Sequence, residues 1–316
     1  MGKKNEILVI GDYTEWQTKM FKEFFESFFL TSTLDIKNLS IGLRERIEAV
    51  AFKGHSELGE EEFKLLPKLK LISNFGVGFD TISIVGASKC GVTVTNTPNV
   101  LNDDVADLAI GLLIGLSRRF ADGTNWIRSG NWEKFGEMPL NHSISKRRVG
   151  IIGLGRIGYE IANRLERFKC EIHYYSRSVK KCPPSWKFYS DAVSLAQEVE
   201  IIFVTLVGGR ETVNFVNSEV LDALGVNGFV INVSRGSTVD ELALLDVLES
   251  RKIRGAGLDV FYAEPKINRR FLQLDNVLIQ PHQGSGTFES RRAMSELQIK
   301  NLKNYFSGIK LVTPVN

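Results

Sequence analysis

Short β-rich runs alternate along this chain with stretches in which apolar residues recur at helical spacing. In the first hundred residues the runs are EILVI, TLDIKNLS, EAVAF, LKLISNF and GVTVTN. A second series follows, made of RRVGIIG, EIHYYS, EIIFVTL, GFVINVS, GAGLDV and NVLIQ. Strands that alternate with helices are typical of parallel α/β sheets. The alternation therefore predicts an α/β protein with two doubly wound, Rossmann-like parallel-sheet domains.

Two long helices are predicted outside these series. The first lies between them, in NDDVADLAIGLLIGLSRR, and is apolar nearly all the way round, which fits either a core helix or one that also contacts another subunit. The second, in FESRRAMSELQIKNLKNYF, is amphipathic and follows the last predicted strand. We expect it to fold back on the first domain. The predicted domains are residues 1–98 plus 287–316, and residues 99–286, with ligands in the cleft between them.

Composition and charge argue against several classes of protein. The 40 basic and 37 acidic residues are scattered along the chain, so a nucleic-acid-binding surface is not indicated. The three cysteines form no C-x-x-C pair, and no cluster has metal-ligand spacing, which favours reduced thiols, a cytoplasmic location and no metal. The most apolar stretch, 105–116, is too short to cross a bilayer and contains Asp107, so no membrane association is expected.

A glycine-rich turn joins a predicted strand to a predicted helix in VGIIGLGRIGYEIANRLERF. Gly153, Gly155 and Gly158 form the pattern G-x-G-x-x-G, which gains its weight from that context. The first glycine permits the tight turn, the second lets a pyrophosphate approach the backbone, and the third lets the helix pack on the strand. With Arg156 and Ile157 at the helix start, the turn predicts a dinucleotide site. A turn without a ligand is the alternative.

The next predicted strand, EIHYYSRS, ends without the acid that would hold a ribose 2′-hydroxyl. Ser176, Arg177 and Ser178 stand there instead. Without a carboxylate to repel a 2′-phosphate, and with a guanidinium to contact one, the stretch favours NADPH as cofactor, with NADH possible. A solvated basic loop is the alternative.

Polar residues follow three neighbouring strands of the second series. Arg235 comes after GFVINVS, Asp259 and Glu264 come after GAGL, and His282 comes after NVLIQP. Ligands of doubly wound sheets lie beyond the carboxyl ends of the strands. Each residue alone also fits an ordinary surface or turn role. Together, beside a dinucleotide site, they predict a reaction centre.

The chemistry of hydride transfer explains why these residue types suit that centre. When a hydride joins a carbonyl carbon, the oxygen must gain a proton, and a histidine such as His282 suits that exchange. A neighbouring carboxylate orients the imidazole and favours its protonated form. The planar, permanently charged guanidinium of Arg235 suits a substrate carboxylate or a polarised carbonyl.

Several motifs of this sequence resemble those of a known family. The motifs GLGRIG, NVSRG followed by VDE, GLDVF with AEP, and PHQGSGT look like the D-2-hydroxyacid dehydrogenases. Together with NTPNVLNDDVADLAIGLL and YYSRS they are most similar to the family's NADPH-dependent hydroxyphenylpyruvate, hydroxypyruvate and glyoxylate reductases. The resemblance covers most of residues 70–316. It implies a substrate-binding, flavodoxin-like domain at 1–98 plus 287–316 and a dinucleotide-binding domain at 99–286.

The resemblance also implies roles for single residues. Arg235, Glu264 and His282 match the family's catalytic trio, and Arg235 and His282 also contact substrate. Asp259 matches the acid near the nicotinamide. Further contacts are implied at Val105 for the cofactor, and at Val77 and Gly78, whose backbone N–H groups would hold the substrate carboxylate. Members are usually homodimers, with the helix after Asn102 in the contact.

The chain departs from the family pattern in two places, and one histidine has an open role. Relatives usually have a proline-containing loop beside the cofactor, and this chain has the Val207–Arg210 loop there instead, in VTLVGGRET. Next to the predicted catalytic histidine, Gln283 replaces a small apolar residue. His55, in FKGHSEL, either contacts substrate or is a solvated loop residue. His142 and His173 are expected to be structural or to face solvent.

Three functions are compatible with these features. The first is reduction of a 2-oxo acid to the D-2-hydroxy acid with NADPH. The second is a nucleotide-sensing, corepressor-like binding protein, since relatives on this fold act in that way. The third is an NAD-linked dehydrogenase that runs towards oxidation. The intact trio favours an enzyme.

Overall fold

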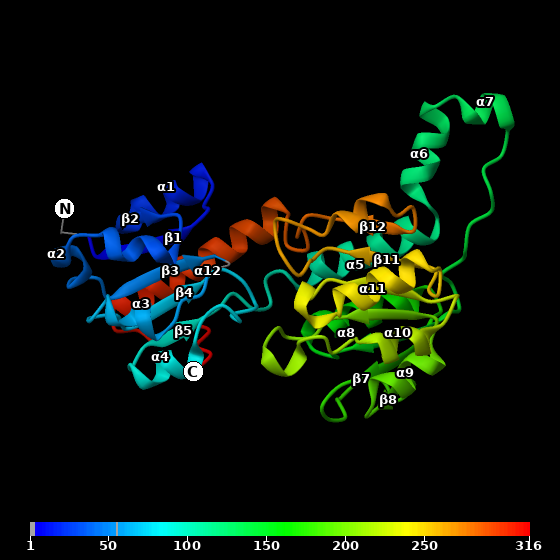
Figure 1. The fold of residues 1–316 in the computed structure, drawn as a ribbon. Coiled ribbons are helices and arrows are strands. Elements are labelled where there is room, and N and C mark those ends of the chain that lie inside the picture. The colour runs from blue at the N-terminus through cyan, green and yellow to red at the C-terminus, as the bar shows by residue number, and fades with distance from the viewer. Residues whose placement is uncertain (1–3, 55) are drawn as a thin grey trace. The chain divides into compact units, whose positions relative to one another are not determined.

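The computed structural model describes residues 4–54 and 56–316, so His55 lies outside the described residues. Internal contacts divide the chain into two compact units (Figure 1). Unit 1 comprises Met1–Leu101 and Phe288–Asn316, and unit 2 comprises Asn102–Thr287. Each unit contains one sheet in which every strand pair is parallel. The predicted fold class of two parallel-sheet α/β domains is confirmed.

Unit 1 has a five-stranded sheet in the order β2-β1-β3-β4-β5. Its strands are β1 (Glu6–Gly11), β2 (Glu26–Leu30), β3 (Ala49–Lys53), β4 (Leu71–Asn74) and β5 (Thr93–Thr95). Its helices are α1 (Glu15–Phe24), α2 (Ile41–Arg44), α3 (Glu60–Lys64), α4 (Ile84–Lys89) and α12 (Phe288–Phe306), with a 3-10 helix at Thr33–Asn38. The order reverses between β1 and β3, which is the flavodoxin-like arrangement.

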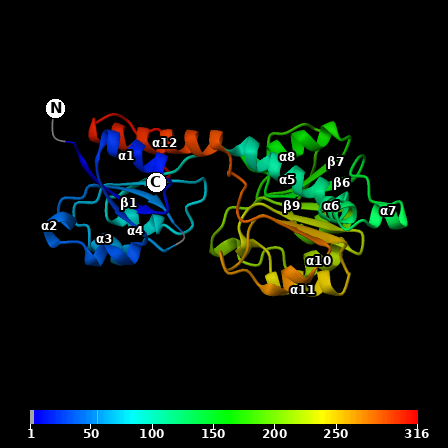
Figure 2. The ribbon, with the colours of Figure 1, turned by 90° about the horizontal axis from the view of Figure 1, so that it is seen from above.

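The core of unit 1 lies on both faces of its sheet because successive strand residues point to opposite sides. In β1, Ile7 and Val9 pack with α1 and with Ile299 and Leu302 of α12. The alternate residues Leu8 and Ile10 pack with α2, α3 and α4. The two helical layers are seen above and below the sheet in Figure 2. The C-terminal helix is therefore part of unit 1.

One predicted strand is wrong. TLDIKNLS forms a 3-10 helix at Thr33–Asn38, and β2 lies earlier, in ESFFL. The Ser32 hydroxyl accepts a hydrogen bond from the Leu34 backbone N–H, and the Asp35 carboxylate accepts one from the Ser32 N–H. This local capping satisfies the backbone of a helical turn, so the apolar residues of the segment reach the core without pairing as a strand.

Unit 2 has a seven-stranded sheet in the order β12-β11-β10-β9-β6-β7-β8. Its strands are β6 (Arg148–Ile152), β7 (Glu171–Tyr175), β8 (Lys187–Tyr189), β9 (Ile201–Val204), β10 (Phe229–Asn232), β11 (Gly255–Leu258) and β12 (Val277–Ile279). The order reverses between β6 and β9, as in dinucleotide-binding sheets. The short strand β8 has no counterpart among the predicted runs.

Helices cover both faces of the unit 2 sheet. They are α5 (Asn102–Ser117), α6 (Phe120–Arg128), α7 (Asn131–Phe135), α8 (Arg156–Arg167), α9 (Ala192–Glu198), α10 (Ser218–Leu224) and α11 (Glu241–Glu249), with 3-10 turns at Arg210–Thr212, Gly236–Thr238 and Arg269–Gln273. Helices α5 and α8 lie on one face and α10 and α11 on the other (Figure 2). Helix α5 packs on β10, β11 and β12.

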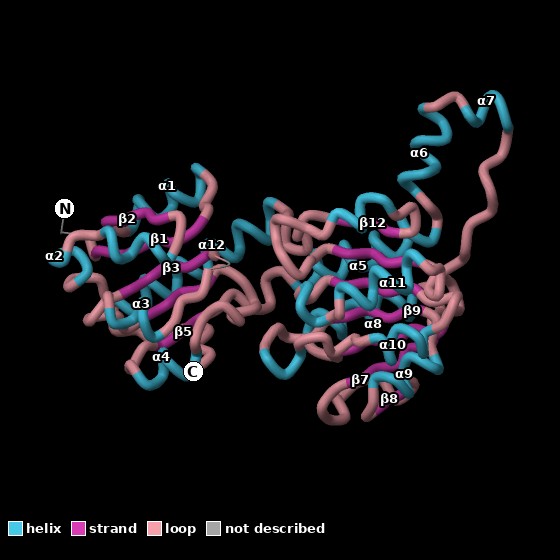
Figure 3. The backbone as a smooth tube through the Cα atoms, viewed as in Figure 1, coloured by secondary structure: helices cyan, strands magenta, loops and turns pink. Residues whose placement is uncertain are grey.

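Helices α6 and α7 form an arm that projects from the rest of unit 2 (Figure 3). Neither helix contains a buried residue. Across residues 4–54 and 56–316, every helix is too short or too polar to cross a bilayer.

Candidate active site

The predicted reaction-centre residues lie at one edge of the unit 2 sheet. Arg235 follows β10, Asp259 directly follows β11, and His282 follows β12. Because β10, β11 and β12 are parallel neighbours, their carboxyl ends meet at the same edge. The structure therefore brings these three loops together, as the sequence predicts.

His282 and Glu264 form a direct hydrogen bond. The Nδ1 atom of His282 lies 2.7 Å from Oε2 of Glu264. The second carboxylate oxygen, Oε1, accepts a hydrogen bond from the backbone N–H of Phe261 at 2.9 Å. An ionised carboxylate only accepts, so Nδ1 of His282 is the donor. The His282 side chain is 37% exposed.

Asp259 holds the loop that carries His282. Its backbone carbonyl accepts from the His282 N–H at 2.8 Å, and its two carboxylate oxygens accept from the N–H groups of Gln283 at 2.6 Å and Gly284 at 2.7 Å. His282 has φ +55°, a left-handed conformation that costs energy outside glycine. These three hydrogen bonds impose it. Burial raises the pKa of Asp259, and the loop N–H groups and His282 act to lower it.

The Arg235 loop packs directly on the Glu264 loop. The Arg235 carbonyl accepts hydrogen bonds from Asn232 and Thr238, and one guanidinium nitrogen donates to the Ser234 carbonyl. At Gly236 a Cβ atom would lie 1.9 Å from the carbonyl carbon of Phe261, so no side chain fits there. Glycine at 236 thus lets Arg235 approach the chain segment that positions Glu264. Sequence reasoning missed this role, although the glycine directly follows the arginine.

The three glycines of the turn after β6 have different surroundings. Gly153 has φ +103°, which favours glycine, and a Cβ atom at Gly158 would lie 2.6 Å from the Gly153 carbonyl oxygen. At Gly155 a Cβ atom would meet nothing within 4 Å, and this residue precedes the first turn of α8. The turn is therefore tight, the helix is close to the strand, and open space lies before the helix N-terminus. These features fit a bound pyrophosphate.

The other predicted cofactor residues surround this edge. Val105, in α5, would be 3.3 Å from a Cβ atom at Gly284 and so lies against the His282 loop. After β7, the Ser176 hydroxyl donates to the Ser178 carbonyl at 2.6 Å. The Arg177 side chain is 90% exposed and lies 3.9 Å from Glu211. Its guanidinium is therefore available to a ligand, with one acid nearby.

The Val77–Gly78 stretch follows β4 in unit 1. The Asn96 side-chain amide donates to the Val77 carbonyl at 2.9 Å, and the Asn74 amide donates to the Gly78 carbonyl at 2.9 Å. Sequence reasoning did not single out these two asparagines, whose signal is their place at the ends of β4 and β5. They fix the orientation of the peptide groups of the predicted anion nest.

Of the sequence departures, Gln283 has a side chain that is hydrogen-bonded within its own loop. Its side-chain amide donates to the Pro281 carbonyl within its own loop. In the Val207–Arg210 loop, the Thr212 hydroxyl hydrogen-bonds the carbonyls of Val207 and Gly209. Both segments are thus held by local hydrogen bonds.

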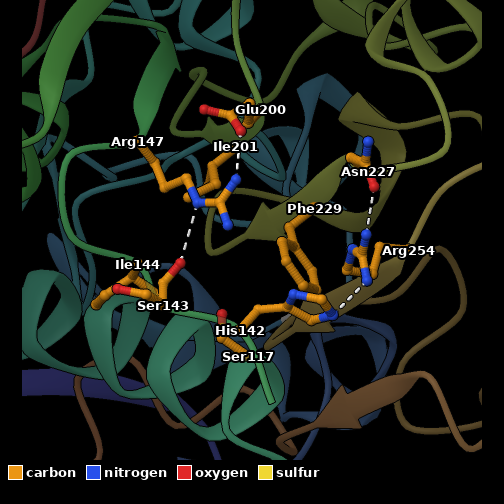
Figure 4. Close-up of a pocket in the computed structure, with 10 residues that line it drawn as sticks. All are labelled: Ser117, His142, Ser143, Ile144, Arg147, Glu200, Ile201, Asn227, Phe229 and Arg254. Atoms are coloured by element: carbon orange, nitrogen blue, oxygen red, sulfur yellow. Dashed lines mark hydrogen bonds and ion pairs between the residues drawn. The ribbon is translucent and has the colours of Figure 1, made fainter. Parts of the chain in front are cut away.

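The remaining described histidines have structural partners. His173, in β7, is buried between Tyr189 and Glu171. His142 lines a small polar cavity with Arg147, Glu200 and Arg254 (Figure 4). The cavity lies at the amino ends of β6, β9 and β10, opposite the reaction edge, and its volume of about 20 Å³ suits about one water molecule. Burial and then Arg254 and Arg147 lower the pKa of His142.

Known proteins resemble this chain over most of its length. Residues 110–284 match the family described as D-isomer specific 2-hydroxyacid dehydrogenase, NAD binding domain. A hydroxyphenylpyruvate reductase of Plectranthus scutellarioides is 45% identical, and the match covers 86% of each chain. A 2-ketogluconate reductase of Gluconobacter oxydans is 36% identical over 100% of both chains.

A solved structure has the same fold and a bound cofactor. It is the NADPH-dependent glyoxylate/hydroxypyruvate reductase of Sinorhizobium meliloti in complex with NADP and malonate. Its TM-score to this chain is 0.93, with 38% identity, and the match covers 99% of this chain and 97% of that one. This chain therefore belongs to the D-isomer specific 2-hydroxyacid dehydrogenase family and is an oxidoreductase that binds a nicotinamide cofactor.

Proposed function

We propose that this enzyme reduces a 2-oxo acid to the D-2-hydroxy acid, with NADPH as the preferred cofactor. The observation that carries the proposal is the hydrogen bond between His282 and Glu264. It lies at the same sheet edge at which the loop that carries Arg235 begins. Relatives named as hydroxyphenylpyruvate, glyoxylate/hydroxypyruvate and 2-ketogluconate reductases support a substrate of this class.

His282 is the proposed proton donor. With Nδ1 held by Glu264, a protonated imidazole presents its Nε2–H to the keto oxygen of the substrate. The carboxylate stabilises the positive charge that the ring carries before the transfer. When bound, the dihydronicotinamide supplies the hydride. Proton delivery by His282 then balances the charge that develops on the oxygen.

Arg235, Val77 and Gly78 are the proposed substrate-binding groups. A guanidinium offers two parallel N–H donors to a carboxylate or a polarised carbonyl. The backbone N–H groups of Val77 and Gly78 suit the 1-carboxylate, since the carbonyls of the same two peptide groups, those of Gly76 and Val77, already accept hydrogen bonds from Asn74 and Asn96.

The glycine-rich turn and the start of α8 are proposed to hold the pyrophosphate of the cofactor. The residues concerned are Gly153, Gly155, Arg156, Ile157 and Gly158. Ser176, Arg177 and Ser178 are proposed to select NADPH by contacting the 2′-phosphate. Further along, Val105 and Asp259 are proposed to border the nicotinamide, because both pack on the His282 loop.

The preference for NADPH is supported by the exposed guanidinium of Arg177 and by the relative solved with NADP. We expect Arg177→Ala to lower kcat/KM with NADPH by about tenfold or more, because one charge-assisted contact is lost. The value with NADH should change little. Equal losses with both cofactors would refute this role of Arg177.

A panel of 2-oxo acids assayed with NADPH and with NADH tests the proposed function. The panel contains glyoxylate, hydroxypyruvate, phenylpyruvate and hydroxyphenylpyruvate. Turnover of at least one acid, with a higher kcat/KM for NADPH, is the expected result. Tight NADPH binding without oxidation of NADPH across the panel would favour the sensor function, and a preference for NADH would favour the NAD-linked dehydrogenase.

We also propose that the protein is a homodimer whose contact includes the arm formed by α6 and α7. The arm exposes four large apolar side chains, those of Phe120, Ile127, Trp132 and Phe135. Several large apolar side chains exposed on one projecting segment are typical of interaction surfaces. By contrast, α5 packs on the unit 2 sheet and is largely buried within the unit.

A further inference from the structure

The small polar cavity at the amino ends of β6, β9 and β10 lies at the opposite end of these strands from the reaction edge (Figure 4). Its lining belongs to unit 2 and comes from the end of α5, from residues 142–147 before β6, from the starts of β9 and β10, and from Arg254 before β11. The volume of about 20 Å³ admits one water molecule or one monatomic ion. The proposed function uses none of the residues in this lining.

A buried hydroxyl group points into this cavity. It belongs to Ser117, the last residue of α5, which is only 2% exposed. The Ser117 carbonyl accepts a hydrogen bond from the His142 N–H at 3.1 Å, but the hydroxyl has no hydrogen-bond partner within residues 4–54 and 56–316. Figure 4 shows its oxygen directed into the space that the Arg147 guanidinium also faces. Because an unpaired buried hydroxyl costs free energy, its position indicates a ligand in the cavity.

The charge around the cavity is positive. Among the described residues that line it, Arg147 and Arg254 carry a guanidinium and Glu200 carries a carboxylate. Glu200 pairs with Arg147 at 2.5 Å. Arg254 donates instead to Nε2 of His142 and to Oδ1 of Asn227. A guanidinium only donates, so the His142 ring accepts in its neutral form, and neither partner of Arg254 offsets its charge.

The acceptor groups around the cavity are already engaged. The Ser143 carbonyl accepts from Nε of Arg147 at 3.0 Å, and Glu200 accepts from Nη1 of Arg147 and from the Arg148 N–H. Among the described residues, the Ser117 hydroxyl and Nη2 of Arg147 are donors left without a partner. A water molecule both donates and accepts, whereas an anion only accepts. An anion therefore matches these donors and the positive charge better than water does.

We propose that this cavity binds one monatomic anion of the halide class, held by the Ser117 hydroxyl and by the guanidinium groups of Arg147 and Arg254. The bound anion joins three segments of unit 2: the end of α5, the stretch before β6 and the turn before β11. Because these segments separate on unfolding, the anion binds the folded protein and stabilises it. The site is independent of the proposed reaction.

Thermal unfolding of the full chain in bromide tests the site in solution. Sodium gluconate, whose anion is too large for the cavity, is replaced stepwise by sodium bromide at constant ionic strength. Saturating NADPH is present throughout, so that bromide does not act through the phosphate-binding groups of the cofactor site. We expect Tm to rise by about 2 °C or more and to level off as the site fills. An unchanged Tm would overturn the proposal.

Variants locate the bromide effect at the cavity. We expect Ser117→Ala to weaken the apparent Kd for bromide by about fivefold, because one hydrogen bond is lost, and Arg254→Met to weaken it by about tenfold or more, because a charge is lost. Ser117→Ala removes a hydroxyl that has no protein partner, so this variant should fold as well as the unsubstituted protein. The control Arg251→Met, at an exposed arginine paired with Asp275, should keep the full response. An unchanged bromide response in both Ser117→Ala and Arg254→Met would refute the site.

The anomalous scattering of bromide locates the ion directly. In crystals of the full chain grown in sodium bromide, we expect an anomalous difference peak in the cavity, in contact with the Ser117 hydroxyl and with Arg147 and Arg254. A water molecule in the cavity, with bromide peaks elsewhere, would contradict the proposal. A cavity peak without the Tm response in solution would mean an adventitious ion only, which also overturns it.

Discussion

At the scale of single residues, the reaction centre depends on how tightly its loops are fixed. Asp259 illustrates this, because one side chain accepts from two consecutive backbone N–H groups of the His282 loop. Its buried carboxylate was predicted from the family resemblance as a residue near the nicotinamide. The structure adds that Asp259 also holds the left-handed conformation of His282. Sequence patterns do not reveal such hydrogen bonds between loops.

The contact at Gly236 gives a prediction about loop packing. We expect Gly236→Ala to lower kcat strongly and to cost about 1–3 kcal/mol of unfolding free energy, because the new Cβ atom would overlap the Phe261 backbone. Steady-state kinetics and denaturant titration measure the two effects. Gly111→Ala is the control, since a Cβ atom there meets nothing within 4 Å in an exposed position of α5. Wild-type turnover in Gly236→Ala would contradict the packing.

At the scale of elements, the alternation of strands and helices predicts most of the fold because buried parallel strands leave a strong apolar signal. The runs EILVI and EAVAF cover all but the last residue of β1 and β3, and NVLIQ contains β12. The failure at TLDIKNLS has a local cause: the Ser32 and Asp35 caps decide in favour of a helical turn. Strand β8 has three residues, of which two are partly buried, so it is too short for an apolar strand pattern to be recognised in the sequence.

The amino ends of β6 and β9 are joined by an ion pair that makes stability depend on pH. Glu200 accepts a hydrogen bond from the Arg147 guanidinium at 2.5 Å (Figure 4). It also accepts one from the Arg148 backbone N–H at 3.2 Å. Burial acts to raise the pKa of Glu200, but these hydrogen bonds outweigh it and leave the pKa lowered. A lowered pKa in the folded state means that ionised Glu200 stabilises the fold.

This stabilisation is fully present above the pKa of an unfolded glutamate, about 4.3, and is lost as the pH falls through the lower pKa of the folded protein. We expect Glu200→Gln to be less stable than the unsubstituted protein at pH 7 by no more than about 1 kcal/mol, because Arg147 is partly exposed. The difference should shrink towards pH 3.5. Denaturant titrations at both pH values test this, and a difference that grows at low pH would contradict it.

At the scale of the whole molecule, the two units carry different residues of the proposed site. Unit 2 contains the glycine-rich turn and the residues Arg235, Glu264 and His282, and unit 1 contains the Val77–Gly78 stretch. The motifs of unit 2 were predictable because cofactor chemistry demands fixed residue types at fixed spacing. The contact of Asn96 with the Val77 carbonyl was not, because the two residues follow different strands and meet only through the fold.

The exposed arm gives a prediction about assembly. We expect Trp132→Glu to convert the proposed dimer to a monomer or to weaken it by about tenfold or more, because a charge replaces an apolar side chain in the contact. Analytical ultracentrifugation over a range of protein concentrations measures the association. Leu242→Glu, at a similarly exposed leucine of α11, is the control and should not change it. A Trp132→Glu protein that associates as tightly as the unsubstituted one would refute the contact.

Proton delivery by His282 is the central step of the proposed reaction. The direct measurement is kcat for His282→Ala with NADPH and the best 2-oxo acid of the panel, together with the Kd for NADPH. We predict a loss of kcat of about 10²–10⁴-fold, which is typical of an acid–base group, with the Kd for NADPH within about threefold. A His282→Ala enzyme that turns over at close to the unsubstituted rate would contradict the central claim.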